Sequence, residues 1–254
     1  GGGLDVTGVI TATSYSGDGS SLSGVSPSVS AVASGTIPNG ATVVINTDGT
    51  VGVVTQTGSA DPSAGTPVVF ESAASALFST VYDSANGKVV IAYRDEGNSS
   101  YGTAIVGTVS GTSISFGTPV VFDSTAAAFI SAIYDSSNEK VVIAYRDDGN
   151  SFHGTAVVGT VSGTSISFGS PVLFQSATTN DIGATFDSTN GKVVIAYRDS
   201  GNSSYGTAIV GTVSGTSISF GSETVFESAT TFNSSLTFDS TNGKVVIAYR
   251  DSGN

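Results

Sequence analysis

A short apolar sequence recurs four times along the chain at an interval of 52 residues. The run Val-Val-Ile-Ala-Tyr-Arg-Asp begins at Val89, Val141, Val193 and Val245. Alternate residues of a strand point to opposite faces, and in this run both faces are apolar up to the arginine and the aspartate. A strand of this kind is typically covered on both sides within a layered structure. We therefore expect each copy to bury this strand between neighbouring layers.

The rest of each copy predicts three further strands. In the second copy the four strands are expected at Phe129–Asp135, Lys140–Asp147, Thr155–Ser162 and Ser165 to about Phe174, the last interrupted near residues 169–171. Asn-Gly pairs join the first two strands at Asn86-Gly87, Asn190-Gly191 and Asn242-Gly243. Such pairs supply the positive φ angles that a two-residue hairpin turn requires. The second copy has Asn138-Glu139 at this place, so its turn should form less favourably.

These elements predict an all-β protein. Four antiparallel strands per copy, with successive sheets packed face to face, are typical of the blades of a β-propeller. The alternative is a trimeric β-fibre, in which small sheets wind around a trimer axis. The copies begin near Phe70, Phe122, Phe174 and Phe226, and the fourth stops after its second strand. We therefore expect further repeats beyond Asn254.

Composition divides the chain into three parts. Residues 1–26 form a β segment expected to serve in assembly and attachment, and residues 27–66 form a linker with a β-hairpin module. The hairpin is expected from Ala41–Asn46 and Val51–Gln56, which are joined by Asp48-Gly49. Residues 67–254 contain the four copies of the repeat.

The charge balance excludes some classes of partner. Asp and Glu number 20 against eight Lys and Arg, which gives a net charge of −12. A protein that binds nucleic acid needs basic surface to neutralise phosphates, so nucleic acid is not expected as a partner. Insertion into a membrane is not expected either, because no apolar run approaches the roughly 20 residues of a membrane span. The chain has no cysteine, and we expect neither a metal site nor a cofactor.

The end of the repeated strand is the place where binding chemistry is expected. Arginine recognises carboxylates, and tyrosine, aspartate and asparagine form hydrogen bonds with sugars. The candidate binding residues are Arg94, Asp95, Asn98, Tyr101, Arg146, Asp147, Asn150, His153, Arg198, Asp199, Asn202 and Tyr205. The structural alternative is that each arginine clamps an aspartate or a loop carbonyl between neighbouring copies.

Two further observations bear on this end of the repeat. The second and third copies differ most in character at Asp148, at Phe152-His153 and at Asn180-Asp181. His153 replaces a tyrosine of the other copies and has no cluster of partners, so it is interpreted as a loop variation. The Asp-Ser-x-Asn-Gly turns offer one aspartate and one asparagine each. Because calcium usually takes 6 to 8 oxygen ligands, turn chemistry is the preferred interpretation.

Two N-terminal stretches resemble parts of known proteins. The stretch Val6–Val25 resembles short β segments in tail-fibre and other virion structural proteins of marine phages, cyanophages especially. The stretch Ile37–Val51 is similar to hairpin modules of the same kind of protein. This resemblance implies a homotrimer that attaches to other virion proteins through its N-terminal segment, while distal domains meet the host surface.

The repeats more loosely resemble propellers of the sialidase kind, in which a strand ending in an aromatic residue and an aspartate also recurs. The catalytic residues of that family do not carry over, because the arginines occur once per copy at one equivalent position. The tryptophan of the family's Asp-box is missing as well, since the chain has no Trp.

Taken with the repetition, the resemblance implies a virion appendage without enzymatic activity that attaches to host-surface polysaccharide. Repeated weak sites suit this task, because linked sites gain on the order of 10²–10⁴ in avidity without new contacts. A bacterial surface or secreted adhesin is the main alternative, and a sialidase-like glycan hydrolase is a further one.

Overall fold

The computed structural model describes residues 32–33, 35–37, 43–45, 47–48, 50–53 and 65–253. By its contacts the chain divides into two units, residues 1–62 and 63–254. In the first unit, β3 (Thr50–Val53) pairs antiparallel with β2 (Val43–Ile45) and parallel with β1 (Val32–Ala33). The pairing of β2 with β3 confirms the expected hairpin. The proposed assembly segment, residues 1–26, lies outside the described residues.

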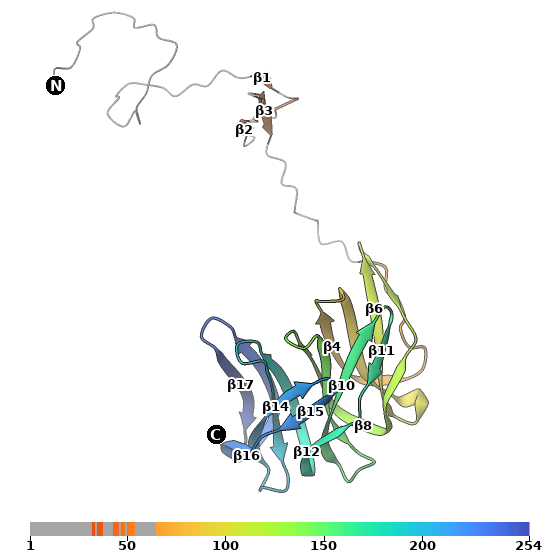
Figure 1. Cartoon of the computed structure of the whole chain (residues 1–254), viewed down its shortest axis with the longest axis vertical. Helices are drawn as coiled ribbons and strands as arrows, with labels where there is room; N and C mark the ends of the chain where they lie inside the picture. Colours follow the sequence, from red (N-terminus) through yellow and green to blue (C-terminus); the bar gives the residue numbers. More distant parts are fainter. Residues whose placement is uncertain are drawn as a thin grey trace, which may run out of the picture. The chain divides into compact units, whose positions relative to one another are not determined.

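The second unit consists of antiparallel strands, as the apolar pattern predicts (Figure 1). Its 14 strands are β4 (Ser75–Asp83), β5 (Lys88–Asp95), β6 (Tyr101–Ser110), β7 (Ser113–Phe116), β8 (Val120–Asp135), β9 (Lys140–Asp147), β10 (His153–Ser162), β11 (Ser165–Phe168), β12 (Val172–Asp187), β13 (Lys192–Asp199), β14 (Tyr205–Ser214), β15 (Ser217–Phe220), β16 (Thr224–Asp239) and β17 (Lys244–Asp251). The described part of the chain contains one short 3-10 turn, η1 (Glu96–Asn98), and no α-helix. The all-β expectation is therefore confirmed.

The strand bounds differ from the sequence prediction at the junctions between copies. The last strand expected in one copy and the first strand expected in the next are parts of one long strand of 16 residues in β8, β12 and β16. The N-terminal half of β8 pairs with β6, and its C-terminal half pairs with β9. The interruption expected near residues 169–171 is present between β11 and β12, but the strand expected to end near Phe174 continues to Asp187 and passes into the next sheet.

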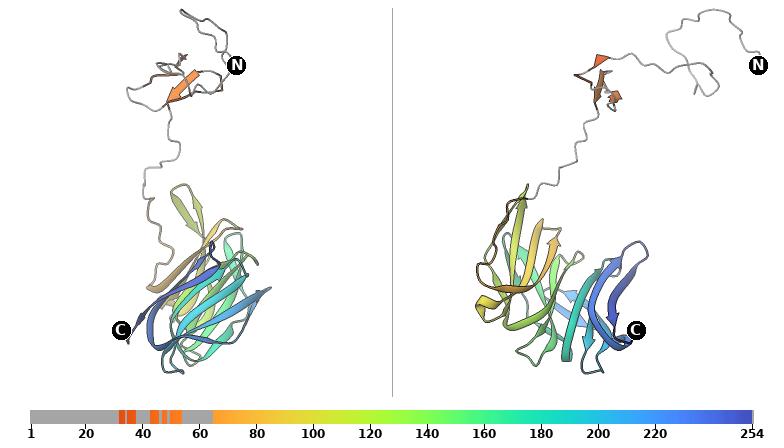
Figure 2. Two further views of the ribbon diagram at one scale, coloured as in Figure 1. Left: turned by 90° about the vertical axis from the view of Figure 1, so that its left-hand side faces the viewer. Right: turned by 180° about the vertical axis from the view of Figure 1, so that it is seen from behind.

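Successive sheets pack face to face, because alternate residues of the repeated strand point to opposite faces and join different apolar clusters. Val90 and Ala92 of β5 share an apolar cluster with Val141, Ile143 and Tyr145 of β9. The intervening residues of β9, Val142 and Ala144, join a second cluster with residues of β13. Both faces of β9 are therefore buried, as predicted, and the sheets follow one another in sequence order from yellow to blue in Figure 2.

Aromatic side chains fill the junctions between copies. In the second copy Phe122 packs against Tyr145 and Phe168, with ring centroids 5.1 and 5.7 Å apart. In the third copy the same contacts join Phe174 to Tyr197 and Phe220. A glycine faces each phenylalanine. At Gly154, for example, a Cβ atom would lie 2.4 Å from a ring carbon of Phe174, so the close approach of strand and ring requires glycine.

The turns after the first strand of each copy differ from the expected two-residue form. Asp83 pairs with Lys88, which leaves four residues in the loop, and only Gly87 in this loop has a positive φ angle, +62°. The Asp83 side chain explains the longer turn, because its Oδ1 accepts hydrogen bonds from the backbone N–H groups of Ala85 and Asn86 at 3.1 and 3.0 Å. In the second copy Glu139 takes the glycine position with φ 55°, so the expected penalty of that turn has a visible cause.

The strand order of the second unit is open, with β4 at one end and β17 at the other. Described residues thus form neither a closed barrel nor a closed ring. The coarse architecture is one continuous antiparallel sheet of 14 strands, in which the long strands β8, β12 and β16 each pair with strands of two successive copies.

Candidate functional site

All twelve candidate residues lie at one end of the stacked sheets. We call this end, formed by the last residues of β5, β9 and β13 and the loops that follow them, the arginine end. The opposite end, where the same strands begin at Lys88, Lys140 and Lys192, is the lysine end. Strand register brings the candidates of each copy together: Asp95 pairs with Tyr101, Asp147 with His153 and Asp199 with Tyr205. The asparagines Asn98, Asn150 and Asn202 are exposed in the loops between them.

The aspartates of the candidate set hold the loops in place. Asp147 Oδ1 accepts hydrogen bonds from the N–H groups of Gly149 and Asn150, both at 3.0 Å, and Asp95 Oδ1 accepts from Asn98 at the same distance. Asp199 accepts from Gly201 in the third copy. Because these carboxylates are committed to the backbone, they shape the arginine end rather than offer free acceptors to a ligand.

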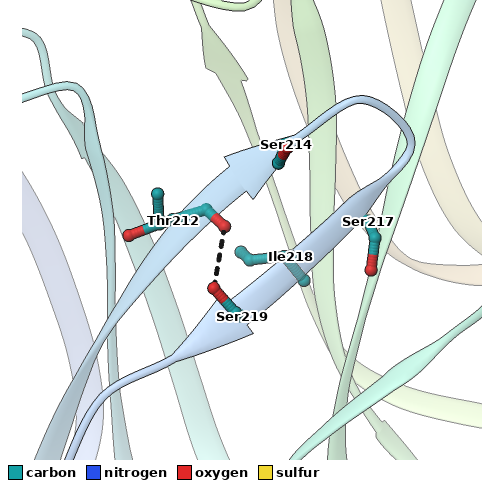
Figure 3. A pocket seen from close by; sticks show the side chains of 5 residues that line it. All are labelled: Thr212, Ser214, Ser217, Ile218 and Ser219. Atoms are coloured by element: carbon teal, nitrogen blue, oxygen red, sulfur yellow. Dashed lines mark hydrogen bonds between the residues drawn. The ribbon is translucent and has the colours of Figure 1, made fainter.

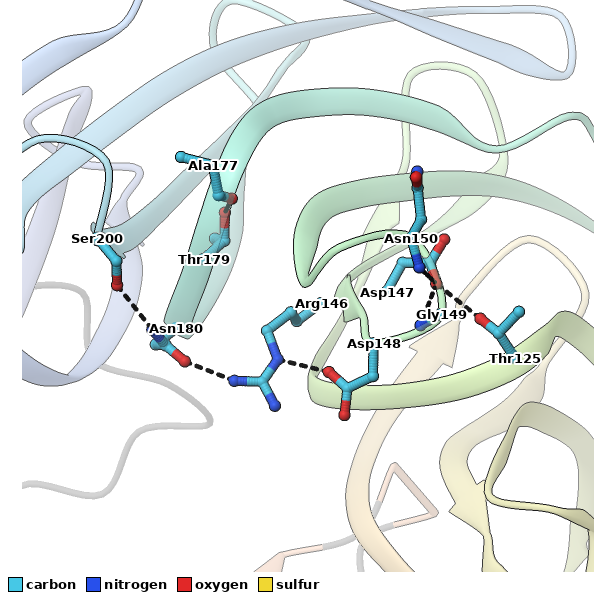
Figure 4. Close-up of polar contacts among 10 residues, drawn as sticks. All are labelled: Thr125, Arg146, Asp147, Asp148, Gly149, Asn150, Ala177, Thr179, Asn180 and Ser200. Atoms are coloured by element: carbon cyan, nitrogen blue, oxygen red, sulfur yellow. Dashed lines mark hydrogen bonds and ion pairs between the residues drawn. The ribbon is translucent and has the colours of Figure 1, made fainter.

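Arg146 contacts more side chains than the equivalent arginines of the other copies do, and Figure 4 shows its polar contacts. Its Nε donates to Asp148 Oδ1 at 2.6 Å, and its Nη1 donates to Asn180 Oδ1 of the next copy at 2.5 Å. Its guanidinium carbon lies 4.8 Å from the ring centroid of Phe129 and 5.2 Å from that of Phe152. The arginine therefore joins two neighbouring sheets, as the structural alternative predicted, and it also fixes two aromatic rings at the rim.

The other arginines use different partners. Arg198 Nε donates to Asp181 Oδ2 at 2.9 Å, and its guanidinium lies 4.9 Å from the ring centroid of Phe232. Arg250 lies over the same ring at 4.2 Å. Arg94 Nη2 is 3.8 Å from Glu96 Oε1, too far for a hydrogen bond. Equivalent arginines thus occupy chemically different settings in successive copies.

Unusual backbone angles concentrate at this end. Each first strand has a β-bulge opposite its arginine, and the bulged residues Leu77, Phe129, Asp181 and Asn233 have positive φ angles of 49 to 55°. In the loop of the second copy Phe152 has φ 64° and is 46% exposed. Positive φ angles are rare for bulky residues and cost of order 1–3 kcal/mol each where they occur. Such strain is a feature of binding and catalytic sites more often than of plain scaffolds.

Each repeated tyrosine faces a polar residue beside the aromatic junctions. Tyr93 Oη donates to Glu71 Oε2 at 3.2 Å in the first copy. In the second copy the corresponding acid is the shorter Asp123, and neither Tyr145 Oη nor Asp123 Oδ2 has a hydrogen-bond partner although both atoms are buried. Burial raises the pKa of the Asp123 carboxyl above its ordinary value and also raises the pKa of Tyr145.

Two other kinds of place in the described part of the chain lack the chemistry of the arginine end. A shallow hollow on the β14–β15 hairpin is lined by Ile218 and by hydroxyls, Thr212, Ser214, Ser217 and Ser219 (Figure 3). It contains no charged or aromatic side chain. No group of three His, Cys, Asp or Glu side chains suited to a metal occurs within the described ranges. The turn aspartates are already bonded to their own loops, and the Asn190 side chain lowers the pKa of Asp187 in this way.

The sequence prediction missed the bulge residues as members of the site. Phe129 and Phe232 lie in strands whose apolar pattern predicts burial, so nothing in their own sequence marked them as partners of arginine. A signal was available for Asp148, Phe152, Asn180 and Asp181, because these are the positions where the copies differ in character. The structure places all four beside Arg146 or Arg198.

Comparison with known proteins finds no family model that matches the chain and no curated protein significantly similar to it. In the part of the chain that the structure describes, no helix is long and apolar enough to cross a membrane.

Proposed function

We propose that the chain is a structural and adhesive part of a virion appendage, such as a phage tail fibre, and that its arginine end attaches to polysaccharide on a host surface. The observation that carries this proposal is the coincidence of three features at one end of the sheets. Arginine, aromatic and amide side chains gather there, the backbone is strained there, and the side chains that contact the arginines differ there from copy to copy.

The chemistry of the arginine end suits sugars. Exposed Asn98, Asn150 and Asn202 each provide both donors and acceptors to hydroxyl groups. The exposed ring of Phe152 offers a flat apolar surface to the carbon face of a pyranose. Each copy contributes one such group of side chains, so a repeating polysaccharide meets several weak sites in a row and gains affinity through avidity.

Adsorption to host cells tests the proposal. We expect the triple variant Tyr101→Ala, His153→Ala and Tyr205→Ala to lose adsorption, because these half-buried residues begin the strands that border each loop. The control is Lys88→Gln with Lys192→Gln, which changes side chains at the lysine end that bond only to threonines of the same sheet, Thr108 and Thr212. Unaltered adsorption by the triple variant, with its fold intact by circular dichroism, would rule out the arginine end as the contact surface.

We also propose that the sheets are blades of a β-propeller. Three features support this arrangement. Each complete copy contributes four strands, the sheets pack face to face, and the first strand of one copy contacts the equivalent strand of the next. In one such contact, Ala132 N of β8 donates to Ser79 Oγ of β4 at 2.9 Å. Electron microscopy of the native particle distinguishes a ring of sheets from the alternative, an elongated trimeric fibre. The proposed homotrimer and its attachment through residues 1–26 are tested by the mass of the particle with and without that segment.

A further inference from the structure

Arg94, Arg146 and Arg198 are each followed by a further copy of the repeat. The side chains that bond Arg146 and Arg198 occupy three positions, each of which has an equivalent near Arg94. Arg146 bonds Asp148, two residues later, and Asn180, 34 residues later in the next copy. Arg198 bonds Asp181, 17 residues earlier in its own copy. The same three positions relative to Arg94 are Glu96, Ala128 and Leu77. Two of the three therefore carry apolar side chains in the first copy.

Arg94 is left with unused hydrogen-bonding capacity as a result. No side chain of the described residues accepts a hydrogen bond from it, and its Nε is buried without a partner. Its nearest carboxylate oxygen, on Glu96, is 3.8 Å from Nη2, and the Arg94 side chain remains 30% exposed. A guanidinium has five N–H donors in a planar fork. Among these three arginines, Arg94 is thus the one without a carboxylate at hydrogen-bonding distance, and its terminal nitrogens remain open to an external acceptor.

We propose that Arg94 binds the carboxylate of an acidic sugar, such as a uronic acid unit of a surface polysaccharide. This inference rests on the proposed function and specifies a ligand class for one copy of the repeat. The arginine fork matches a carboxylate in geometry and charge.

The same comparison assigns different ligands to the other copies. Arg146 and Arg198 are neutralised by carboxylates at 2.6 and 2.9 Å, so their surroundings favour uncharged sugar units. The first copy then recognises the acidic unit of a mixed polysaccharide, and the later copies recognise its neutral units. The overall charge of −12 opposes long polyanions, which suits a ligand bearing isolated acidic groups.

The experiment compares the whole chain and four variants by titration calorimetry near physiological ionic strength. The probes are hexagalacturonate, the neutral hexagalactose and oligoglutamate, which has carboxylates but no sugar. Arg94→Gln removes the charge. Ala128→Asn and Leu77→Asp supply Arg94 with the partners that Arg146 and Arg198 have, and leave its charge in place. Lys88→Gln is the matched control, with the same charge change at the other end of β5.

We expect the wild type and Lys88→Gln to bind hexagalacturonate at least tenfold more tightly than Arg94→Gln does, because tenfold in Kd is about 1.4 kcal/mol and one hydrogen bond to a charged group contributes at least that much. Ala128→Asn and Leu77→Asp should lose a similar factor, and all variants should bind hexagalactose alike. Leu77→Asp keeps the test valid should Ala128→Asn fold poorly, because aspartate tolerates a positive φ angle and occupies the position in the third copy.

The outcomes separate the two proposals. If hexagalactose binds but Arg94→Gln leaves the affinity for hexagalacturonate unchanged, the assignment of Arg94 is wrong and the adhesive function stands. If neither sugar binds to any form of the chain, glycan attachment itself is refuted. Equal, Arg94-dependent binding of oligoglutamate would keep a carboxylate site at Arg94 and overturn its assignment to a sugar.

Discussion

Replacing Asp123 by glutamine should stabilise the protein, because the third copy already uses glutamine at the same position. Gln175 Nε2 donates to Asp199 Oδ2 at 3.0 Å and to Glu223 Oε1 at 2.9 Å, and its Oε1 accepts from Ala177 N. Asp123 has no donor to offer. Its Oδ2 is buried without a partner, so the second copy has a repulsive pair of carboxylates where the third has a hydrogen bond.

The magnitude follows from the contacts that change. Thr125 Oγ1 lies 2.9 Å from Asp123 Oδ1 and 2.6 Å from Asp147 Oδ1, but its single hydrogen can be donated to only one of them. Asp123→Gln removes one unsatisfied buried oxygen, worth about 1–3 kcal/mol, and adds one hydrogen bond to the charged Asp147. After the cost of ordering the longer side chain we expect a net gain of about 1–2 kcal/mol in the free energy of unfolding at neutral pH.

The same substitution should change the pH dependence of stability. Burial raises the pKa of Asp123 above its ordinary value of 3.8. The folded state then holds the proton more tightly than the unfolded state, so wild-type stability falls as the pH rises from that value through the folded pKa. Asp123→Gln should lack this contribution, and its advantage over the wild type should shrink in acid.

Urea denaturation followed by far-ultraviolet circular dichroism at several pH values measures both effects. The reciprocal variant Gln175→Asp is the matched control and should be destabilised by a similar amount. If Asp123→Gln is no more stable than the wild type at neutral pH while Gln175→Asp is equally unaffected, the reasoning about this buried pair is refuted.

Three further substitutions test other parts of the fold. Glu139→Gly should stabilise the second-copy turn by about 1 kcal/mol, because the other copies have glycine at this positive-φ position; an unchanged urea midpoint would contradict this. Gly154→Ala should destabilise by about 1–3 kcal/mol, because the new Cβ would lie 2.4 Å from the Phe174 ring, and thermal unfolding measures it. Phe152→Ser, which installs the residue found in the other copies, should weaken polysaccharide binding while changing stability by less than about 1 kcal/mol. Unchanged binding of that variant would remove Phe152 from the contact surface.

The repeat made most of the fold predictable. The doubly apolar strand gave the buried position of β5, β9 and β13, and the Asp48-Gly49 pair gave the hairpin of the first unit. Strand bounds failed where two expected strands fuse, since the chain stays extended through residues 122–128 and 174–180 while it changes from one neighbouring strand to the next. The turn type failed because the Asp83 side chain caps a longer loop, a tertiary detail that Asn-Gly alone does not reveal.

The candidate site was predictable in place but not in detail. Strand register dictates that Asp95 and Tyr101 come together, and the sequence places both at the ends of strands. The partners of the arginines depend on bulges in β8 and β12, and a bulge has no periodic signature. Comparison of the copies with one another carried the missing information, because Ala128, Asn180 and Phe232 occupy one structural position with three different chemistries.

Hydrogen exchange with and without isolated host polysaccharide tests the central claim most directly. The account predicts slower exchange in the loops at residues 96–100, 148–152 and 200–204 of the arginine end, and no change at residues 84–87, 136–139 and 188–191 of the lysine end. Protection confined to the lysine end, or no protection anywhere at saturating polysaccharide, would contradict attachment through the arginine end.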